Sequence, residues 1–169
     1  NERNVMFVIE ALPTNAVEHE NVIQTVADIE TMVQPDDAWN QKTLAELLEQ
    51  DSIRLLIAYD QAKEDSTSYR EIVGYCLYQT TFEQAEVLRI GTDPKYQRQG
   101  IASQVLNKLH ELLQINQVES LLLEVRADNT AAIALYEQQA FNIIHKRKGY
   151  YKMPHKPAVD ALIMQHNYI

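Results

Sequence analysis

Apolar residues recur along this chain at two spacings, and stretches with each spacing alternate. Recurrence every three to four residues is typical of a helix with one buried face, whereas runs of β-branched and aromatic residues are typical of strands. The helical spacing predicts helices over residues 16–33, 43–48, about 100–113 and 129–138. The strand pattern predicts strands over residues 5–12, 53–59, 72–80, 86–92, 121–126, 141–151 and 159–164, of which the last two form a hairpin.

Short turn-forming segments separate these elements. Segments 13–15 and 35–37 each open with a proline, and each ends the element before it. The polar stretch over residues 61–70 is expected to be the loop of a hairpin. Because the sequence has no repeat, low-complexity tract or linker, we expect a single mixed α/β domain over residues 1–169.

Composition and charge narrow the class of protein. The 169 residues can bury a sizeable core, and 46% apolar with 23% charged residues is ordinary for a water-soluble protein. No apolar run approaches the ~18–20 residues that span a bilayer, and no signal peptide is recognisable, so a cytoplasmic location is expected. The net charge of −9 argues against nucleic acid as the main ligand and suits a basic partner.

Cysteine and histidine usage favours neither a metal site nor a covalent intermediate. Cys76 is the only cysteine, which excludes an internal disulfide and a cysteine-rich zinc site. None of its neighbours, Gly74, Tyr75 and Leu77, is suited to activate the thiol, so we expect Cys76 in the core. The five histidines have neither the spacing of metal ligands nor triad partners, and no metal is expected.

The most informative segment is residues 96–103, YQRQGIAS, between an apolar strand and a helix. The first backbone N–H groups of a helix lack partners within the helix and lie at the positive end of its dipole, which favours an anion such as phosphate. Gly100, one of only four glycines, would let a ligand approach the backbone closely, and Ala102 keeps the next turn narrow. An ordinary strand-to-helix turn is the alternative.

A second unusual position is Glu124, a carboxylate inside the apolar strand over residues 121–126. Such a carboxylate costs free energy unless it is paired, solvated or used in chemistry. Strand alternation places it on the face opposite Leu123 and Val125, and Tyr136 follows about two turns into the next helix, so both could reach one cleft. The alternatives are a salt bridge from Glu124 to Arg89 or Arg126 and a core position for Tyr136.

Together these motifs resemble the GNAT superfamily of acetyl-CoA-dependent N-acetyltransferases. The resemblance rests on QRQGIA at 97–102, LEVR at 123–126, Asn129, AIALYE at 132–137 and Phe141. The run over residues 90–164, with its late Tyr150-Tyr151 pair, is more narrowly similar to the RimI-type ribosomal-protein-alanine N-acetyltransferases. Ala102 and Ala140 stand where glycine is common in relatives, so the end of the helix before Ala140 is expected to differ.

The resemblance implies a GNAT-type fold: a mixed, mostly antiparallel central sheet, splayed between two central strands and flanked by helices. Acetyl-CoA would lie in that opening as co-substrate. Backbone N–H groups of segment 98–103 would bind its pyrophosphate, strand residues would line the pantetheine and acetyl end, and Asn129 would bind the pantetheine arm unless it only caps the helix. The implied cofactor-binding residues are Ile90, Gly91, Thr92, Arg98, Gln99, Gly100, Ile101, Ala102, Ser103 and Asn129.

The implied reaction is direct acetyl transfer to an amine. Glu124 would act as general base and accept a proton from the amine, directly or through one water, and Tyr136 would act as general acid toward the departing thiolate. The implied acceptor is the N-terminal alanine of a small basic ribosomal protein. A small-molecule amine or antibiotic acetyltransferase is the alternative among enzymes, and a non-catalytic acyl-CoA-binding sensor is the alternative outside them.

Overall fold

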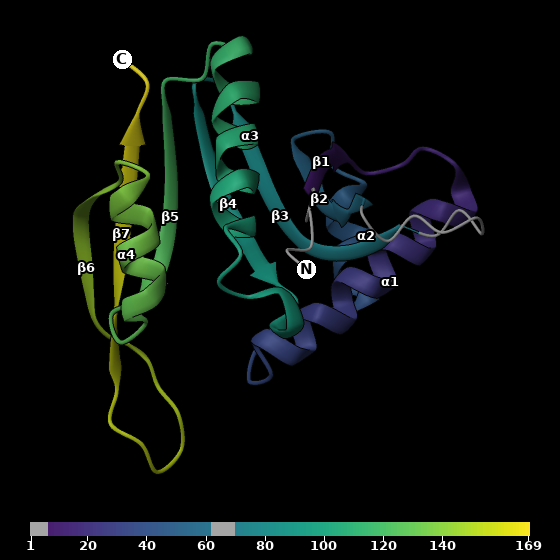
Figure 1. Ribbon diagram of the computed structural model, residues 1–169. Coiled ribbons are helices and arrows are strands. Elements are labelled where there is room, and N and C mark those ends of the chain that lie inside the picture. Colours follow the sequence, from purple (N-terminus) through teal and green to yellow (C-terminus); the bar gives the residue numbers. More distant parts are fainter. Residues whose placement is uncertain (1–6, 62–69) are drawn as a thin grey trace, which may run out of the picture. The chain divides into compact units, whose positions relative to one another are not determined.

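A computed structural model describes residues 7–61 and 70–169, which form two compact units (Figure 1). The first unit comprises residues up to 79 together with 88–110, and the second comprises residues 80–87 and 111–169. Strands β3 (Glu71–Thr81) and β4 (Gln84–Thr92) and helix α3 (Ile101–Ile115) each contribute residues to both units.

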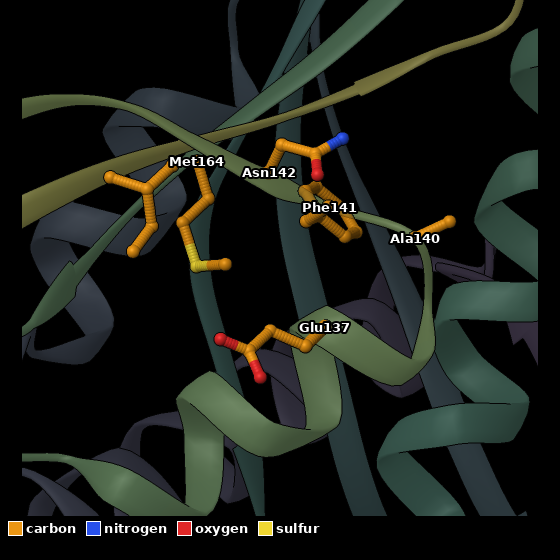
Figure 2. Close-up of a pocket in the computed structure, with 6 residues that line it drawn as sticks. Glu137, Ala140, Phe141, Asn142 and Met164 are labelled. Carbon is orange, nitrogen blue, oxygen red and sulfur yellow. The ribbon is translucent and has the colours of Figure 1, made fainter.

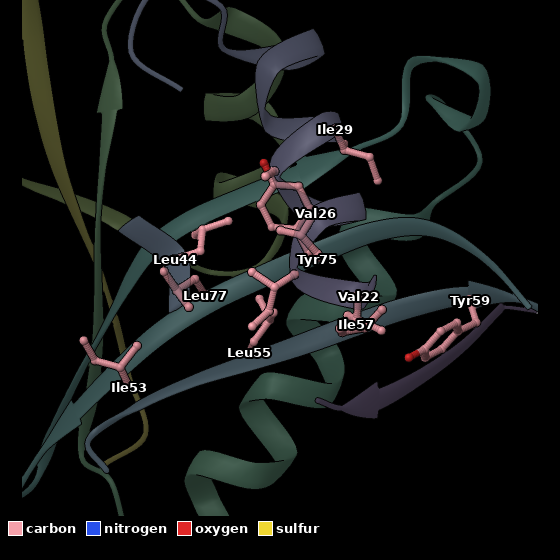
Figure 3. Close-up of a cluster of buried hydrophobic side chains, with 12 residues drawn as sticks. Val22, Val26, Ile29, Leu44, Ile53, Leu55, Ile57, Tyr59, Tyr75 and Leu77 are labelled. Atoms are coloured by element: carbon pink, nitrogen blue, oxygen red, sulfur yellow. The ribbon is translucent and has the colours of Figure 1, made fainter. Parts of the chain in front are cut away.

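The first unit packs two helices onto strands of a sheet. Strand β1 (Phe7–Ala11) pairs antiparallel with β2 (Ile53–Asp60), and β2 pairs antiparallel with β3. Its remaining elements are α1 (Ala16–Val33), α2 (Gln41–Leu48) and a 3₁₀ helix (Pro94–Tyr96). Figure 3 shows its core, which α1 fills from one side with Val22, Val26 and Ile29 and the strands fill with residues such as Leu55, Ile57, Tyr75 and Leu77.

Asparagine side chains set where both of these helices begin. The side chain of Asn15 accepts hydrogen bonds from the backbone N–H groups of Val17 (3.1 Å) and Glu18 (3.2 Å), so α1 begins at Ala16 as predicted. Asn40 accepts from the backbone N–H of Thr43 (2.9 Å) in the same way. Helix α2 therefore begins two residues earlier than the apolar spacing indicates, because the cap, and not the first apolar residue, fixes its start.

The second unit contains the C-terminal strands and one complete helix. These elements are β5 (Ser120–Arg126), α4 (Thr130–Gln138), β6 (Asn142–Tyr151) and β7 (Val159–Asn167). The beginning of β4 pairs in parallel with β5, whereas β5 pairs antiparallel with β7 and β7 with β6. The strand order is β1-β2-β3-β4-β5-β7-β6, which confirms the predicted mixed, mostly antiparallel sheet with flanking helices.

The end of α4 keeps the geometry of a glycine-terminated helix although the residue there is alanine. Ala140 has a φ of 62°, in the left-handed region. The N–H of Phe141 donates to the carbonyl of Tyr136 (2.9 Å), and the N–H of Ala140 donates to that of Glu137 (3.0 Å). This pair of bonds is a Schellman motif. The expectation that the helix would end differently without glycine is therefore wrong.

The other sequence predictions hold to within a few residues. The 3₁₀ helix was not predicted, and β7 extends three residues beyond the predicted end at 164. The predicted hairpin loop over 61–70 and the start of the first strand fall largely on residues 62–69 and 1–6, which lie outside the described residues. Cys76 is fully buried, as predicted, and burial raises the pKa of its thiol to about 12. In residues 7–61 and 70–169, no helix is both long and apolar enough to cross a membrane.

Candidate active site

The predicted phosphate-binding turn lies in the first unit and opens helix α3. The first hydrogen bond within the helix runs from the N–H of Gln104 to the carbonyl of Gly100 (3.0 Å). The N–H groups of Gly100, Ile101, Ala102 and Ser103 precede that bond and point out of the helix end. Gly100 has a φ of 78°, and a Cβ built on it would meet no atom within 4 Å. The turn therefore has the conformation and the open space that a phosphate group requires.

Close packing fixes this helix start against strand β3. A Cβ built on Gly74 would lie 3.0 Å from the Cγ2 of Ile101 and 3.2 Å from the carbonyl oxygen of Gly91. Ile101 itself is buried, whereas Arg98 and Gln99 are exposed at the surface of the turn. The absence of a side chain at Gly74 thus lets the first residue of α3 and the predicted acetyl-CoA strand each approach strand β3 closely.

The predicted acetyl-CoA strand, Ile90, Gly91 and Thr92, forms the end of β4 and is half-buried. Tyr75 of the neighbouring strand packs so tightly there that a Cβ on Gly91 would lie 2.6 Å from its hydroxyl oxygen. Any side chain at position 91 would displace this ring. The backbone of the strand end is therefore held by a contact that only glycine allows.

A buried carboxylate, Glu30 of α1, holds that tyrosine in place. Its side chain is 0% exposed, and it accepts a hydrogen bond from the hydroxyl of Tyr75 (2.7 Å). It also accepts from Arg89 Nε (3.0 Å), from the backbone N–H of Trp39 (2.9 Å) and from Gln34 Nε2 (3.1 Å). Burial and the adjacent Glu30 raise the pKa of Tyr75 well above its ordinary range. The network joins α1, the segment after it, β3 and β4.

The predicted base, Glu124, lies in the middle of β5 in the second unit. Its carboxylate accepts a hydrogen bond from the hydroxyl of Tyr151 (3.1 Å) and lies 3.7 Å from Nη1 of Arg147. The side chain is 29% exposed, which leaves room for an acceptor group or a water to reach it. The burial pattern of β5 alternates, with Leu123 and Val125 buried, so Glu124 takes the face that strand alternation predicts.

The predicted acid, Tyr136, belongs to α4 and is 6% exposed. Its ring centroid lies 5.7 Å from that of Phe141, which lies 5.6 Å from the ring of His166 on β7. The Schellman motif fixes the backbone around both aromatic residues. Packing therefore holds the ring of Tyr136 firmly. This agrees with a core tyrosine and with a general acid alike, so it does not distinguish the two interpretations.

Glu124 and Tyr136 belong to opposite faces of the β5–β7 strand pair. Glu124 is directly opposite Ile163, whereas the ring contacts of Tyr136 lead to His166, which is directly opposite Leu121. Residues 163 and 166 differ by an odd number, so their side chains leave the strand on opposite faces. A reacting centre that both residues serve must lie beyond an edge or an end of this strand pair, and not over either face.

Asn129 caps helix α4. Its side chain accepts a hydrogen bond from the backbone N–H of Ala132 (3.2 Å), which is the alternative that its position allowed. The cap engages the carbonyl oxygen of the side chain, so the amide nitrogen is the group that Asn129 would offer to a pantetheine arm.

The salt-bridge alternative for Glu124 is met by a third arginine, because the carboxylate lies 3.7 Å from Nη1 of Arg147. Arg89 pairs with Glu30, and Arg126 pairs with Asp128 (3.0 Å). The sequence did not indicate Tyr151 and Arg147 as partners of Glu124. They lie on strand β6, and the local sequence pattern does not say how β6 aligns with its neighbouring strands. Sequence reasoning also missed Glu30, although a carboxylate on the apolar stripe of α1 is the same signal that drew attention to Glu124.

A separate hollow of about 350 Å³ opens at the end of α4 (Figure 2). It is lined by Glu137, Ala140, Phe141, Asn142, Ile143 and Met164, and none of the predicted site residues is among them. In the described part of the chain, no three His, Cys, Asp or Glu residues are grouped so that they could hold a metal ion.

Residues 23–141 match the Acetyltransferase (GNAT) family. The [ribosomal protein bS18]-alanine N-acetyltransferase of Haemophilus ducreyi is 38% identical over 98 residues, which are 58% of this chain and 68% of that protein. The crystal structure of the ribosomal-protein-S18-alanine N-acetyltransferase from Escherichia coli is similar with a TM-score of 0.76 and 28% identity, covering 96% of this chain and 94% of that one. Arabidopsis thaliana NAA60 in complex with acetyl-CoA shares the fold, with a TM-score of 0.78 and 16% identity over 96% of this chain and 99% of that one.

The chain therefore belongs to the acetyltransferase (GNAT) family. It is an N-acetyltransferase. The matched segment spans about two thirds of the length of the curated relatives.

Proposed function

We propose that this enzyme acetylates the α-amino group of a protein N-terminus, in particular the N-terminal alanine of a small-subunit ribosomal protein. Its similarity to enzymes that are named for alanine acetylation of ribosomal protein bS18 supports this substrate. The observation that carries the chemistry is Glu124, a partly exposed carboxylate held by Tyr151 on an otherwise apolar strand. The presence of such a carboxylate argues against a non-catalytic acyl-CoA sensor.

The backbone of the turn that opens α3 is the proposed binding site for the pyrophosphate of acetyl-CoA. Four N–H groups at residues 100–103 would donate to the phosphate oxygens, and the helix dipole would favour their negative charge. Arg98 and Gln99 flank the turn, the end of β4 from Ile90 to Thr92 would line the pantetheine and acetyl end, and Asn129 would contribute its amide. When bound, acetyl-CoA supplies an activated thioester.

Glu124 is the proposed general base. A peptide α-amino group has a pKa of about 7.7–8.0, so much of it is protonated and unreactive at neutral pH. The carboxylate would accept that proton, directly or through one water, and leave the nitrogen with a free electron pair for attack on the thioester carbonyl. Arg147 and the hydroxyl of Tyr151 would keep the carboxylate oriented during this transfer.

Tyr136 is the proposed general acid. A phenol is a proton donor at neutral pH, and its packing against Phe141 fixes where that proton is presented. The proton would go to the sulfur as the carbon–sulfur bond breaks. The acetyl group moves to nitrogen, which gives one proton to Glu124 and loses its second proton to solvent as the amide forms. CoA leaves as a neutral thiol, and the Tyr136 phenolate regains its proton from solvent.

The overall charge of −9 is compatible with a basic acceptor. A ribosomal-protein substrate would also place the enzyme in the cytoplasm. A small-molecule amine or an antibiotic is the second candidate acceptor.

Mass spectrometry of the reaction products tests the proposal. The enzyme is mixed with acetyl-CoA and a panel of peptides that begin with alanine, serine or methionine, together with an amino-terminally blocked peptide containing lysine and a polyamine. We expect one acetyl group on the α-amine of the alanine peptide and none on the blocked peptide. Acetylation of the polyamine or of the lysine side chain in preference to the alanine peptide would contradict the proposal.

A further inference from the structure

The positive charge of this acidic protein is concentrated in one hairpin. Residues 142–158, here called the basic hairpin, contain five of the 15 Lys and Arg residues and none of the 24 Asp and Glu residues. They comprise strand β6 and the turn to β7, which extends well past α4 in Figure 1. The five cations are Lys146, Arg147, Lys148, Lys152 and Lys156, and all of them are exposed.

Aromatic side chains lie between these cations. Tyr150 is 50% exposed, its ring centroid lies 5.3 Å from that of Tyr151, and the guanidinium of Arg147 lies 5.2 Å from the centre of its ring. Exposed aromatic rings among cations are typical of surfaces on which unpaired bases stack while the phosphates meet Lys and Arg. Carboxylates also adjoin the hairpin. Glu124 faces Arg147, Asp160 accepts a hydrogen bond from the backbone N–H of Gly149 (2.7 Å), and Glu137 lines the same hollow as Asn142 and Ile143.

Protection of a sheet edge explains only part of this charge. Strand β6 is the last strand in the sheet order, and lysines on an edge strand prevent it from pairing with other chains. That role accounts for Lys146 and Lys148 on the strand. It does not account for Lys152 and Lys156, which lie in the turn beyond the strand, or for the absence of acidic residues, which would protect an edge equally well.

We propose that the basic hairpin binds RNA through its phosphate backbone. At physiological ionic strength charges more than about 8 Å away are largely screened, so an anionic polymer responds to the local charge of the hairpin and not to the net charge of −9. A ribosomal-protein acceptor, if the proposed function holds, would be presented beside RNA. The hairpin cations would repel a basic acceptor tail near Glu124, and bound phosphates would remove that repulsion.

Fluorescence anisotropy with a labelled, unstructured single-stranded RNA tests this surface, in the absence of acetyl-CoA and peptide. We expect binding at about 50 mM salt that weakens as salt rises, with a slope of log K against log salt of about −0.7 for each phosphate contacted. The strand variant K146E/K148E and the turn variant K152E/K156E should each weaken binding about tenfold or more. The control K42E/R54E changes the net charge equally at two exposed positions of the first unit and should bind as the wild type does.

Three results would overturn the proposal. One is no RNA binding by the wild-type protein at this salt concentration, and another is an equal loss in the hairpin and control variants. The third is binding of polyglutamate as tight as that of RNA, which would indicate an acidic protein partner. Melting temperatures show whether each variant is folded, and calorimetry shows whether its acetyl-CoA affinity is unchanged. Because this assay measures no acetylation, a lack of RNA binding would not count against the proposed acetyltransferase function. Likewise, failure to acetylate the alanine peptide would not count against RNA binding.

Discussion

Gly100 is the residue whose replacement best separates a phosphate-binding turn from an ordinary one. A Cβ at this position has no protein atom within 4 Å, so a branched side chain would obstruct a bound ligand without colliding with the rest of the protein. We expect Gly100→Val to weaken acetyl-CoA binding by about tenfold or more, which is at least about 1.4 kcal/mol. Arg98→Ala should weaken it only modestly, because the turn binds through its backbone. Calorimetric titration measures both.

Backbone strain has to be separated from this effect. At a φ of 78° any residue other than glycine costs roughly 1–2 kcal/mol, which lowers the melting temperature without touching the ligand. The melting curve of Gly100→Val therefore accompanies the titration. Near-native affinity in a folded Gly100→Val protein would remove the phosphate-binding assignment.

For Glu124, some properties could be predicted from the sequence and others could not. Its chemistry and its face follow from a carboxylate in an alternating apolar strand. Its partners do not follow, because Tyr151 and Arg147 come from β6 and approach Glu124 only through the pairing of three strands. The alternation of residues along one strand predicts the face on which a side chain lies. The residues that contact it depend on how the neighbouring strands are aligned, which the local sequence does not show.

At the scale of elements, the end of α4 stores strain at Ala140. This alanine occupies the left-handed position that glycine takes without penalty. We expect Ala140→Gly to stabilise the protein by about 0.5–1 kcal/mol, since removal of the Cβ relieves more strain than the added freedom of the unfolded chain costs. For a protein of this size that is a rise in melting temperature of about 1–4 °C.

The neighbouring residue provides the matched control for this change. Gln139 has a φ of −85°, which any residue adopts readily, so Gln139→Gly should lower the melting temperature. A stabilisation by Gln139→Gly equal to that by Ala140→Gly would contradict the strain at Ala140. The strain was not foreseen because the sequence shows only that glycine is missing, not that the backbone keeps the glycine conformation.

At the scale of the whole molecule, the types and order of the elements were predictable because periodicity and turn residues are local. The position of β7 between β5 and β6 was not, because a hairpin pattern does not say which of its strands joins the sheet. Charge behaves similarly. The sum of −9 predicts an acidic protein, whereas the structure shows that five of the 15 Lys and Arg side chains are exposed together on one hairpin.

The pH–rate profile of Glu124→Gln shows whether Glu124 takes a proton during acetyl transfer. The variant keeps shape and hydrogen bonding but cannot accept a proton. We expect it to lose about 10²–10⁴-fold in rate at neutral pH and to recover partly at high pH, where the amine is already free. Tyr136→Phe, measured alongside, should lose rate without such recovery, because it lacks the acid and not the base.

Melting curves of the same variants separate catalysis from structure. We expect Glu124→Gln to melt near the wild-type temperature while its rate falls, because the ion pair of Glu124 with Arg147 is half-exposed and contributes little to stability. A lowered melting temperature with unchanged turnover per folded molecule would rule out Glu124 as the general base and leave it as a structural residue.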